Sequence, residues 1–208
     1  MLYTKKGDDG TTKTFGCDQR ISKSSNITEA LGSLDEINSF LGLCKVQAAF
    51  LDFKLGDSSL AEIVHEIQKN LFIVQAELAG AEKSIDEKKV KELEEIIDGI
   101  EKELPPIKSF FVSGGPADVT KWQQSGAGLG AIFDIARTIA RRAERRVIAV
   151  SEDIAQPALP VSGEESKNKK QISKYTMAYL NRLSSILYAL ARYSNHKVGI
   201  MEESPDYR

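Results

Sequence analysis

The sequence predicts an all-α fold, a five-helix bundle in which long antiparallel helices run up and down within one domain. Five segments carry apolar residues three or four positions apart, the spacing that gathers them on one face of a helix. The stretches between these segments hold few of the alternating patterns typical of strands. With 208 residues and 41% hydrophobic content, the chain can bury one full core. We therefore expect a single domain over residues 1–208.

The helices are expected at about 26–53, 58–81, 86–104, 129–151 and 172–196. In the first one, the helical spacing runs through Ile27, Leu31, Leu34, Ile37, Leu41 and Cys44. The third should stop before Pro105 and Pro106, because proline lacks a backbone donor and clashes with the preceding turn. This gives a helical body over 26–200, preceded by a loop over 1–25. The tail, 201–208, is expected to be frayed.

The composition excludes several classes of protein. A formal net charge of -2 and a pI of about 5.8 argue against general nucleic-acid binding. Two cysteines, Cys17 and Cys44, and an amino terminus without an apolar secretory segment favour a reducing, cytoplasmic location. No run approaches the roughly 20 apolar residues that span a bilayer, so no membrane insertion is expected.

The amino-terminal loop, residues 1–25, is polar and punctuated by glycines. Glycines let backbone amides converge on an anion, Lys5 and Lys23 add positive charge, and Asp8 or Asp9 could hold a hydrated Mg²⁺. The loop does not match the Walker A phosphate-binding pattern. Two interpretations remain open at this stage: an anion-binding loop, or a turn-rich terminus without a ligand.

Residues 136–147 hold five arginines and one glutamate in twelve positions. At about 100° per residue, Arg137, Arg141 and Glu144 share an arc of roughly 60°, so they should point the same way. Such a face suits an anionic ligand, although charged helix faces are more often simply solvated. The fifth helix offers a polar stripe with the same two interpretations, formed by Asn181, Ser185, Tyr188 and Arg192.

Residues 108–130 interrupt the helical pattern with the short apolar run Phe110 to Val112 and several glycines. Apolar side chains on a loop either plug the core or line a ligand pocket. The polar, lysine-rich stretch 156–171 is expected to be a surface loop. His65 and His196 stand alone, so no metal site is expected at either.

Several motifs in order, in residues 3–12, 29–39, 67–79, 136–147 and 179–184, resemble those of the PduO-type ATP:cob(I)alamin adenosyltransferases. The resemblance implies a helical bundle assembled as a homotrimer, with active sites between subunits that bind ATP, Mg²⁺ and cobalamin. It also implies the activity: transfer of the 5'-deoxyadenosyl group of ATP to the cobalt of cob(I)alamin, which gives adenosylcobalamin and triphosphate. A cobalamin reductase and an adenosylcobalamin-dependent enzyme are the implied protein partners.

The resemblance also implies roles for individual residues. Arg137, Arg141 and Glu144 would meet ATP or its magnesium from the neighbouring chain, with Glu144 as the candidate metal ligand. Asp35 would pair with Arg137 across the subunit boundary, and Phe110 would shield the lower face of the corrin ring. The triphosphate and nucleoside would be held by Thr4, Lys5, Gly7, Asp8, Gly10, Thr11, Lys23 and Asn181.

The chain departs from the family pattern at the corrin side. Ser113 stands where relatives usually have proline, Ser185 stands where they tend to have aspartate, and the loops 116–128 and 156–171 are longer. An alternative of another class is therefore a non-catalytic ATP- or corrinoid-binding protein that delivers or senses cobalamin. The metabolic pathway, the preferred lower ligand of the corrinoid, and the roles of Arg142, Arg145 and Arg146 are not determined by the sequence.

Overall fold

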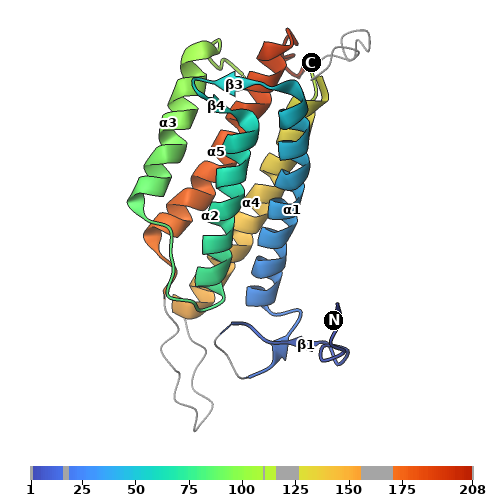
Figure 1. Ribbon diagram of the computed structural model, residues 1–208, viewed down its shortest axis with the longest axis vertical. Helices are drawn as coiled ribbons and strands as arrows, with labels where there is room; N and C mark the ends of the chain where they lie inside the picture. Colours follow the sequence, from blue (N-terminus) through green and yellow to red (C-terminus); the bar gives the residue numbers. More distant parts are fainter. Residues whose placement is uncertain (1, 16–18, 110, 116–126, 156–170, 208) are drawn as a thin grey trace.

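The computed structural model describes residues 2–15, 19–109, 111–115, 127–155 and 171–207. Within these ranges it contains five long helices. They are α1 (Asn26–Leu51), α2 (Leu60–Leu78), α3 (Glu87–Glu103), α4 (Ala127–Ala155) and α5 (Lys174–Lys197). Successive helices run in opposite directions along the long axis (Figure 1). The predicted all-α, up-and-down bundle is confirmed.

The helix α4 lies in the middle of the packing order, because it contacts α1 on one side and α5 on the other. α2 packs against α1, and α3 packs against α5. The apolar face of each helix turns inward, so that Leu34, Leu71, Phe133, Leu183 and Tyr193 have no exposed surface. Burial of these faces, rather than helix propensity alone, is what stabilises the bundle.

Capping side chains set three of the helix starts, those of α2, α3 and α5. Before α5, Ser173 Oγ accepts a hydrogen bond from the backbone of Tyr175 at 3.2 Å. Before α2, Ser59 Oγ accepts a hydrogen bond from the backbone of Glu62 at 3.2 Å, while Glu62 Oε2 accepts one from the backbone of Ser59 at 2.8 Å. Before α3, Asp86 Oδ1 accepts a hydrogen bond from the backbone of Lys89 at 2.9 Å. These contacts satisfy amides that the first helical turn leaves unpaired.

Two short antiparallel hairpins were not predicted. β1 (Thr11–Thr12) pairs with β2 (Ile21–Ser22), and β3 (Lys54–Leu55) pairs with β4 (Ser58–Ser59). Strands of two residues are too short to show an alternating pattern. The first hairpin lies beside the start of α1, where Asn26 Nδ2 donates to Asp153 Oδ2 of α4 at 2.8 Å (Figure 1).

Residues 202–204 of the carboxyl-terminal tail are hydrogen-bonded to the rest of the protein, so the expectation of a frayed tail is wrong for this part. The carboxylate of Glu202 accepts from Arg192 Nε at 2.9 Å, and the backbone amide of Val112 donates to the carbonyl of Glu203 at 2.8 Å. The hydroxyls of Ser109 and Ser204 share a hydrogen bond of 2.5 Å. The physical reason is that residues 109 and 112 hold polar groups, the amide of Val112 and the hydroxyl of Ser109, that form hydrogen bonds with the tail. None of the helices in the described ranges has the length and apolar character needed to cross a bilayer.

Candidate active site

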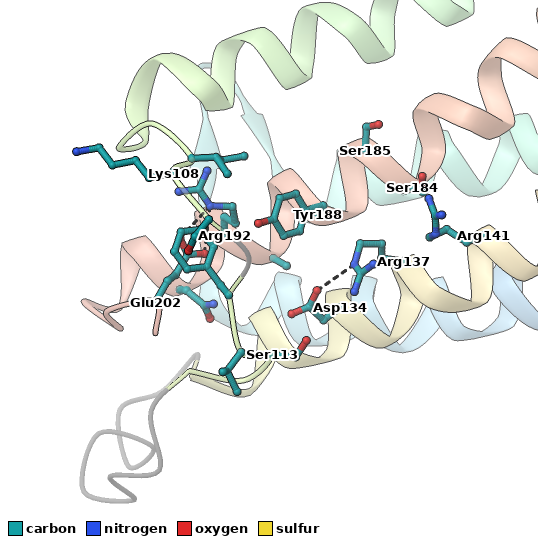
Figure 2. Close-up of a pocket in the computed structure, with 16 residues that line it drawn as sticks. Lys108, Ser113, Asp134, Arg137, Arg141, Ser184, Ser185, Tyr188, Arg192 and Glu202 are labelled. Carbon is teal, nitrogen blue, oxygen red and sulfur yellow. Dashed lines mark hydrogen bonds and ion pairs between the residues drawn. The ribbon is translucent and has the colours of Figure 1, made fainter. Parts of the chain in front are cut away.

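A cavity of about 570 Å³ opens between α4, α5 and the segment that follows α3 (Figure 2). α4 contributes Asp134, Arg137 and Arg141, which lie on one face because they are three and four residues apart. α5 contributes polar residues from the predicted stripe, and residues 107–109 and 111–113 close the cavity from above. The structure thus brings Arg137 and Arg141 of the arginine face together with Ser185, Tyr188 and Arg192 of the polar stripe. The lining residues from α5 include Ser184, Ser185, Tyr188 and Arg192.

Arg137 is held in a fixed position by two neighbours. Its Nε donates to Asp134 Oδ1 at 3.1 Å, and its Cζ lies 5.9 Å from the centre of the Tyr188 ring. Both side chains of the ion pair are mostly buried, with 29% of Arg137 and 14% of Asp134 exposed. Burial beside these charges raises the pKa of Tyr188, chiefly through desolvation. The terminal nitrogens of Arg137, which lines the cavity (Figure 2), make no hydrogen bond to the described part of the chain.

Arg141 lies one helical turn further along the same wall. It is exposed, and within the described part of the chain it makes no hydrogen bond or ion pair. A guanidinium carries five donors in a planar fork that suits phosphate oxygens. Arg141 is thus the cation of this cavity that is best placed to take an anionic ligand.

Glu144 and Asn181, two further predicted residues, are hydrogen-bonded to each other. Asn181 Nδ2 donates to Glu144 Oε1 at 3.1 Å across the α4–α5 contact. Asn181 Oδ1 accepts from Arg182 at 2.8 Å, and Arg182 pairs with Glu94 of α3 at 2.9 Å. The chain of contacts orients Asn181 while leaving it exposed. The structure therefore places Glu144 and Asn181 together on the same side of the bundle as Arg141.

The amino-terminal loop forms a second hollow, of about 480 Å³, at the other end of the bundle. Gly10 has a φ of 78°, which suits glycine, and Lys5 has a φ of 58°. Lys23 Nζ donates to the carbonyl of Gly7 at 2.7 Å, which ties the two ends of the loop together. Six of the seven predicted loop residues line the hollow, namely Thr4, Lys5, Gly7, Asp8, Thr11 and Lys23.

Arg20 organises this loop, and the sequence analysis gave it no role. Its guanidinium donates to Thr11 Oγ1 at 2.5 Å, to the carbonyl of Thr11 at 2.9 Å and to the carbonyl of Lys6. Thr11 also donates to Asp9 Oδ1, through its hydroxyl at 2.7 Å and its amide at 3.0 Å, and these bonds lower the pKa of Asp9. Because Asp9 already accepts these bonds, Asp8 is the freer of the two carboxylates considered for magnesium. Only the three-dimensional fold reveals these contacts, since Arg20 lies outside the glycine motif.

The cationic cavity and the loop lie far apart within one chain. Twelve residues of α4 separate Arg141 from Asp153, which contacts the start of α1, and this is roughly 18 Å of helix. Arg137 lies about 6 Å further away. Asp35 is exposed on α1, and the ion pair of Arg137 within the chain is made with Asp134 instead. The predicted contact between Asp35 and Arg137 of another chain stays a prediction.

Two of the unassigned arginines have structural partners. Arg142 pairs with Glu36 at 2.5 Å and Arg146 with Glu29 at 3.9 Å, so both connect α4 to α1 at the surface. Arg145 is exposed. Ser113 and Ser185, the two departures from the family pattern, both line the cavity.

Three of the predicted features lie wholly or mostly outside the described residues. They are Phe110 and the two long loops, 116–128 and 156–171, of which only residues 127, 128 and 171 are described. Among the residues that are described, no group of three or more potential metal-ligating side chains occurs. The cavity wall also includes residues that the sequence analysis gave no role at the site. These are Lys108, Asp134, Asn195 and Glu202.

The fold and the two sites define a class of protein. It is a helical bundle with two arginines lining a cavity and with a glycine-rich cationic loop, both of which suit a polyphosphate ligand. The family model described as cobalamin adenosyltransferase matches residues 2–194, and the chain belongs to that family. The resemblance noted from the sequence is confirmed.

Curated relatives agree with this assignment. The chain is 33% identical over 202 residues to the corrinoid adenosyltransferase PduO of Citrobacter freundii, covering 94% of this chain and 50% of the relative. It is 34% identical over 203 residues to a corrinoid adenosyltransferase of Bacillus subtilis (strain 168), covering 96% and 89%. The chain thus spans about half the length of the PduO relatives from Citrobacter freundii and Salmonella typhimurium.

Solved structures of a PduO-type ATP:corrinoid adenosyltransferase from Lactobacillus reuteri share the fold. A phenylalanine-to-histidine variant in complex with cobalamin and ATP superposes with a TM-score of 0.76 at 27% identity, covering 100% of this chain and 97% of that one. An arginine-to-lysine variant in complex with ATP gives a TM-score of 0.75 at 27% identity, covering 99% and 100%.

Proposed function

We propose that the protein is an ATP:corrinoid adenosyltransferase, which transfers the 5'-deoxyadenosyl group of ATP to the cobalt of a reduced corrinoid. The observation that carries this proposal is the cavity between α4 and α5, where Arg137 is fixed by Asp134 and Arg141 is left without a partner in the described chain. The related structures that hold ATP and cobalamin have the same fold over their whole length.

In this reaction the protein contributes mainly the alignment of the substrates and positive charge for the leaving group. The cobalt(I) electron pair attacks the 5' carbon of ATP, a cobalt–carbon bond forms, and the carbon–oxygen bond breaks with its electrons leaving on triphosphate. No side chain has to act as nucleophile or general base. Arg137, Arg141, Lys5 and Lys23 supply the cations that a departing polyphosphate needs, and the fixed geometry aligns the reacting atoms.

We further propose that each active site is shared between two subunits. The loop and the arginines are both suited to the triphosphate, yet roughly 18 Å of helix or more separates them in one chain. A triphosphate cannot touch both ends at once unless they come from different chains. The exposed apolar side chains Leu43, Val46 and Phe50 form a stripe on α1 that a second copy would cover. A homotrimer, with Asp35 reaching the neighbour's Arg137, is the assembly that the family resemblance implies.

Magnesium would bind chiefly through the phosphates of ATP. Mg²⁺ keeps several waters and takes one or two carboxylates rather than a complete protein cage. The side chains present fit such a role, because Asp8 lines the loop hollow and Glu144 lies one turn from Arg141 with Asn181 as its only partner among the described residues. We propose residues 1–25 as the ATP loop, 26–200 as the body and the cytoplasm as the location. A reductase that supplies cobalt(I) and an enzyme that uses adenosylcobalamin are the proposed protein partners.

The activity test is a turnover assay with purified protein, ATP, Mg²⁺ and chemically reduced cobalamin under anaerobic conditions. We expect formation of a light-sensitive adenosyl corrinoid together with stoichiometric triphosphate. Binding of ATP and corrinoid without any transfer would contradict the proposal and support a delivery or sensing protein. The serines at 113 and 185 would be the first positions to restore to the family residues in that case.

The shared site is tested by mixing two inactive variants. Lys23→Met disables the loop and Arg141→Ala disables the cavity, so neither protein alone should turn over. If sites form between subunits, unfolding and reassembling an equal mixture should recover about a quarter of wild-type activity, since one random pairing in four joins two intact halves. A site confined to one chain would give no recovery.

A further inference from the structure

We propose that Arg192 is a positioning residue for the corrinoid side of the active site, acting together with Glu202 of the carboxyl-terminal tail. It rests on the proposed function and extends it to a part of the chain that the motifs do not include. Arg192 is 6% exposed although it carries a charge and lies on the polar stripe of α5. A charge so well buried needs several partners, and those of Arg192 come from the carboxyl-terminal tail and from the segment after α3.

The contacts of Arg192 join three segments. Nε donates to Glu202 at 2.9 and 3.2 Å, and a terminal nitrogen donates to the carbonyl of Pro105 at 3.1 Å. The guanidinium carbon lies 5.3 Å from the centre of the Phe111 ring. α5, the tail and the segment after α3 therefore meet at this one side chain, as the cluster around Arg192 in Figure 2 shows.

Arg192, Phe111 and Glu202 together form a partition. All three line the active-site cavity, and all three also line a second cavity of about 280 Å³ on its other side. The partition is supported by the tail, because Glu203 accepts a backbone hydrogen bond from Val112 at 2.8 Å and Ser204 bonds to Ser109 at 2.5 Å. Without the guanidinium, Phe111 and the tail would lose the group that fixes their distance from α5.

The position of the partition indicates which substrate depends on it. The partition closes the end of the cavity away from Arg141, and the bulky, largely apolar corrin ring is the substrate that needs a wall of this kind. ATP, by contrast, would be held by the arginines of α4 and by the amino-terminal loop of a neighbouring chain. Loss of Arg192 should therefore weaken productive binding of the corrinoid and leave ATP binding nearly intact.

The test uses Arg192→Met, which keeps volume but removes the donors, and Glu202→Gln, which keeps shape but removes the charge. For both variants we expect the KM for reduced cobalamin to rise about tenfold while the KM for ATP changes by less than about twofold. Arg192→Lys should recover part of the corrinoid affinity. The double variant should be little worse than Arg192→Met, because both changes break one contact.

A matched control breaks another ion pair of the same helix. Lys197→Met removes the surface contact with Glu103 at 3.3 Å and should leave both KM values unchanged. A titration with cob(II)alamin in the presence of ATP, followed by absorption, should show weaker binding to Arg192→Met than to the wild-type protein. Thermal melting of the same samples identifies any variant that is misfolded. Unchanged corrinoid KM, or an equal rise for both substrates, would overturn the inference. A wild-type protein with no transfer activity would instead overturn the proposed function.

Discussion

Asp134 and Arg137 form an ion pair at 3.1 Å, one helical turn apart, at the edge of the cavity between α4 and α5 that we propose as the active site. Only Nε of Arg137 is used in this pair, so Asp134 positions the guanidinium while its terminal nitrogens stay without a partner in the described part of the chain. Because most of both side chains is buried, removing one partner of this pair leaves a charge without compensation and costs more than breaking a surface pair.

Asp134→Asn should lower kcat/KM about tenfold while the protein stays folded. The amide keeps the shape of the carboxylate but no longer holds the guanidinium by charge, so Arg137 loses its fixed direction. Steady-state kinetics with varied ATP measures the effect. Glu36→Gln, which breaks the surface pair with Arg142, is the control for charge loss on the bundle exterior. If both variants lose the same activity, Asp134 has no special role.

Arg141→Ala should reduce turnover by about a hundredfold or more and change the free energy of unfolding by less than about 0.5 kcal/mol. The side chain is exposed and has no partner in the described chain, so the bundle does not depend on it. Arg145→Ala, one turn further on the same helix, is the matched control and should remain active. Urea unfolding and turnover are measured on the same samples. A parallel loss of stability and activity would make Arg141 a structural residue.

The bundle could be predicted from the sequence because each helix buries a continuous apolar face, and that spacing is local. Helix ends were less certain, since caps such as Ser59 and Asp86 act over only three residues. The arginine face was predicted from the same helical spacing as the helices. The burial and contacts of Arg192 could not be predicted, because its partners Glu202 and Pro105 come from other segments. The spacing along α5 shows only that Arg192 lies on the polar stripe.

Gly7→Ala should raise the KM for ATP about tenfold without changing the melting temperature. A methyl group at Gly7 would lie 3.0 Å from Lys23 Nζ and 3.1 Å from the carbonyl of Thr11, so Lys23 and the loop backbone would have to shift by a few tenths of an ångström. The hairpin is exposed and contributes little to the core. Gly99→Ala in α3, where the nearest atom is 3.9 Å away, is the control and should stabilise the helix by about 0.5–1 kcal/mol. An unchanged KM for ATP would argue against a phosphate-binding role for this loop.

Cys44 should resist thiol reagents at pH 8 as long as the protein is folded. Burial raises the pKa of its thiol to about 12 from an ordinary value of 9.0, so almost no thiolate is present. The unfolded chain loses the thiol proton of Cys44 above pH 9, while the native state keeps it. The free energy of unfolding therefore falls as the pH rises above 9. Peptide mass spectrometry after iodoacetamide treatment, with and without urea, measures the labelling of Cys44. Rapid native labelling would show that α1 opens locally.

Gly130→Ala should cost about 1–3 kcal/mol of unfolding free energy, whereas Gly128→Ala should be nearly neutral. A methyl group at Gly130 would lie 2.0 Å from Asn195 Oδ1 and 2.9 Å from the carbonyl of Ala191, while one at Gly128 meets nothing within 4 Å. Both glycines are in the first turn of α4, so helix propensity is matched. Urea denaturation compares the two variants.

A second variant distinguishes two causes of the expected cost at Gly130: a clash with the side chain of Asn195, and a clash with the backbone carbonyl of Ala191. Asn195→Ala removes the nearest clashing atoms but leaves the carbonyl of Ala191 in place. Adding Gly130→Ala to Asn195→Ala should therefore cost less than the same change in the wild-type protein, although not zero. A full cost in both backgrounds would show that the backbone contact alone sets the helix spacing. Since Arg137 and Tyr188 face each other across this same pair of helices, Gly130→Ala should also reduce turnover more than its stability loss explains.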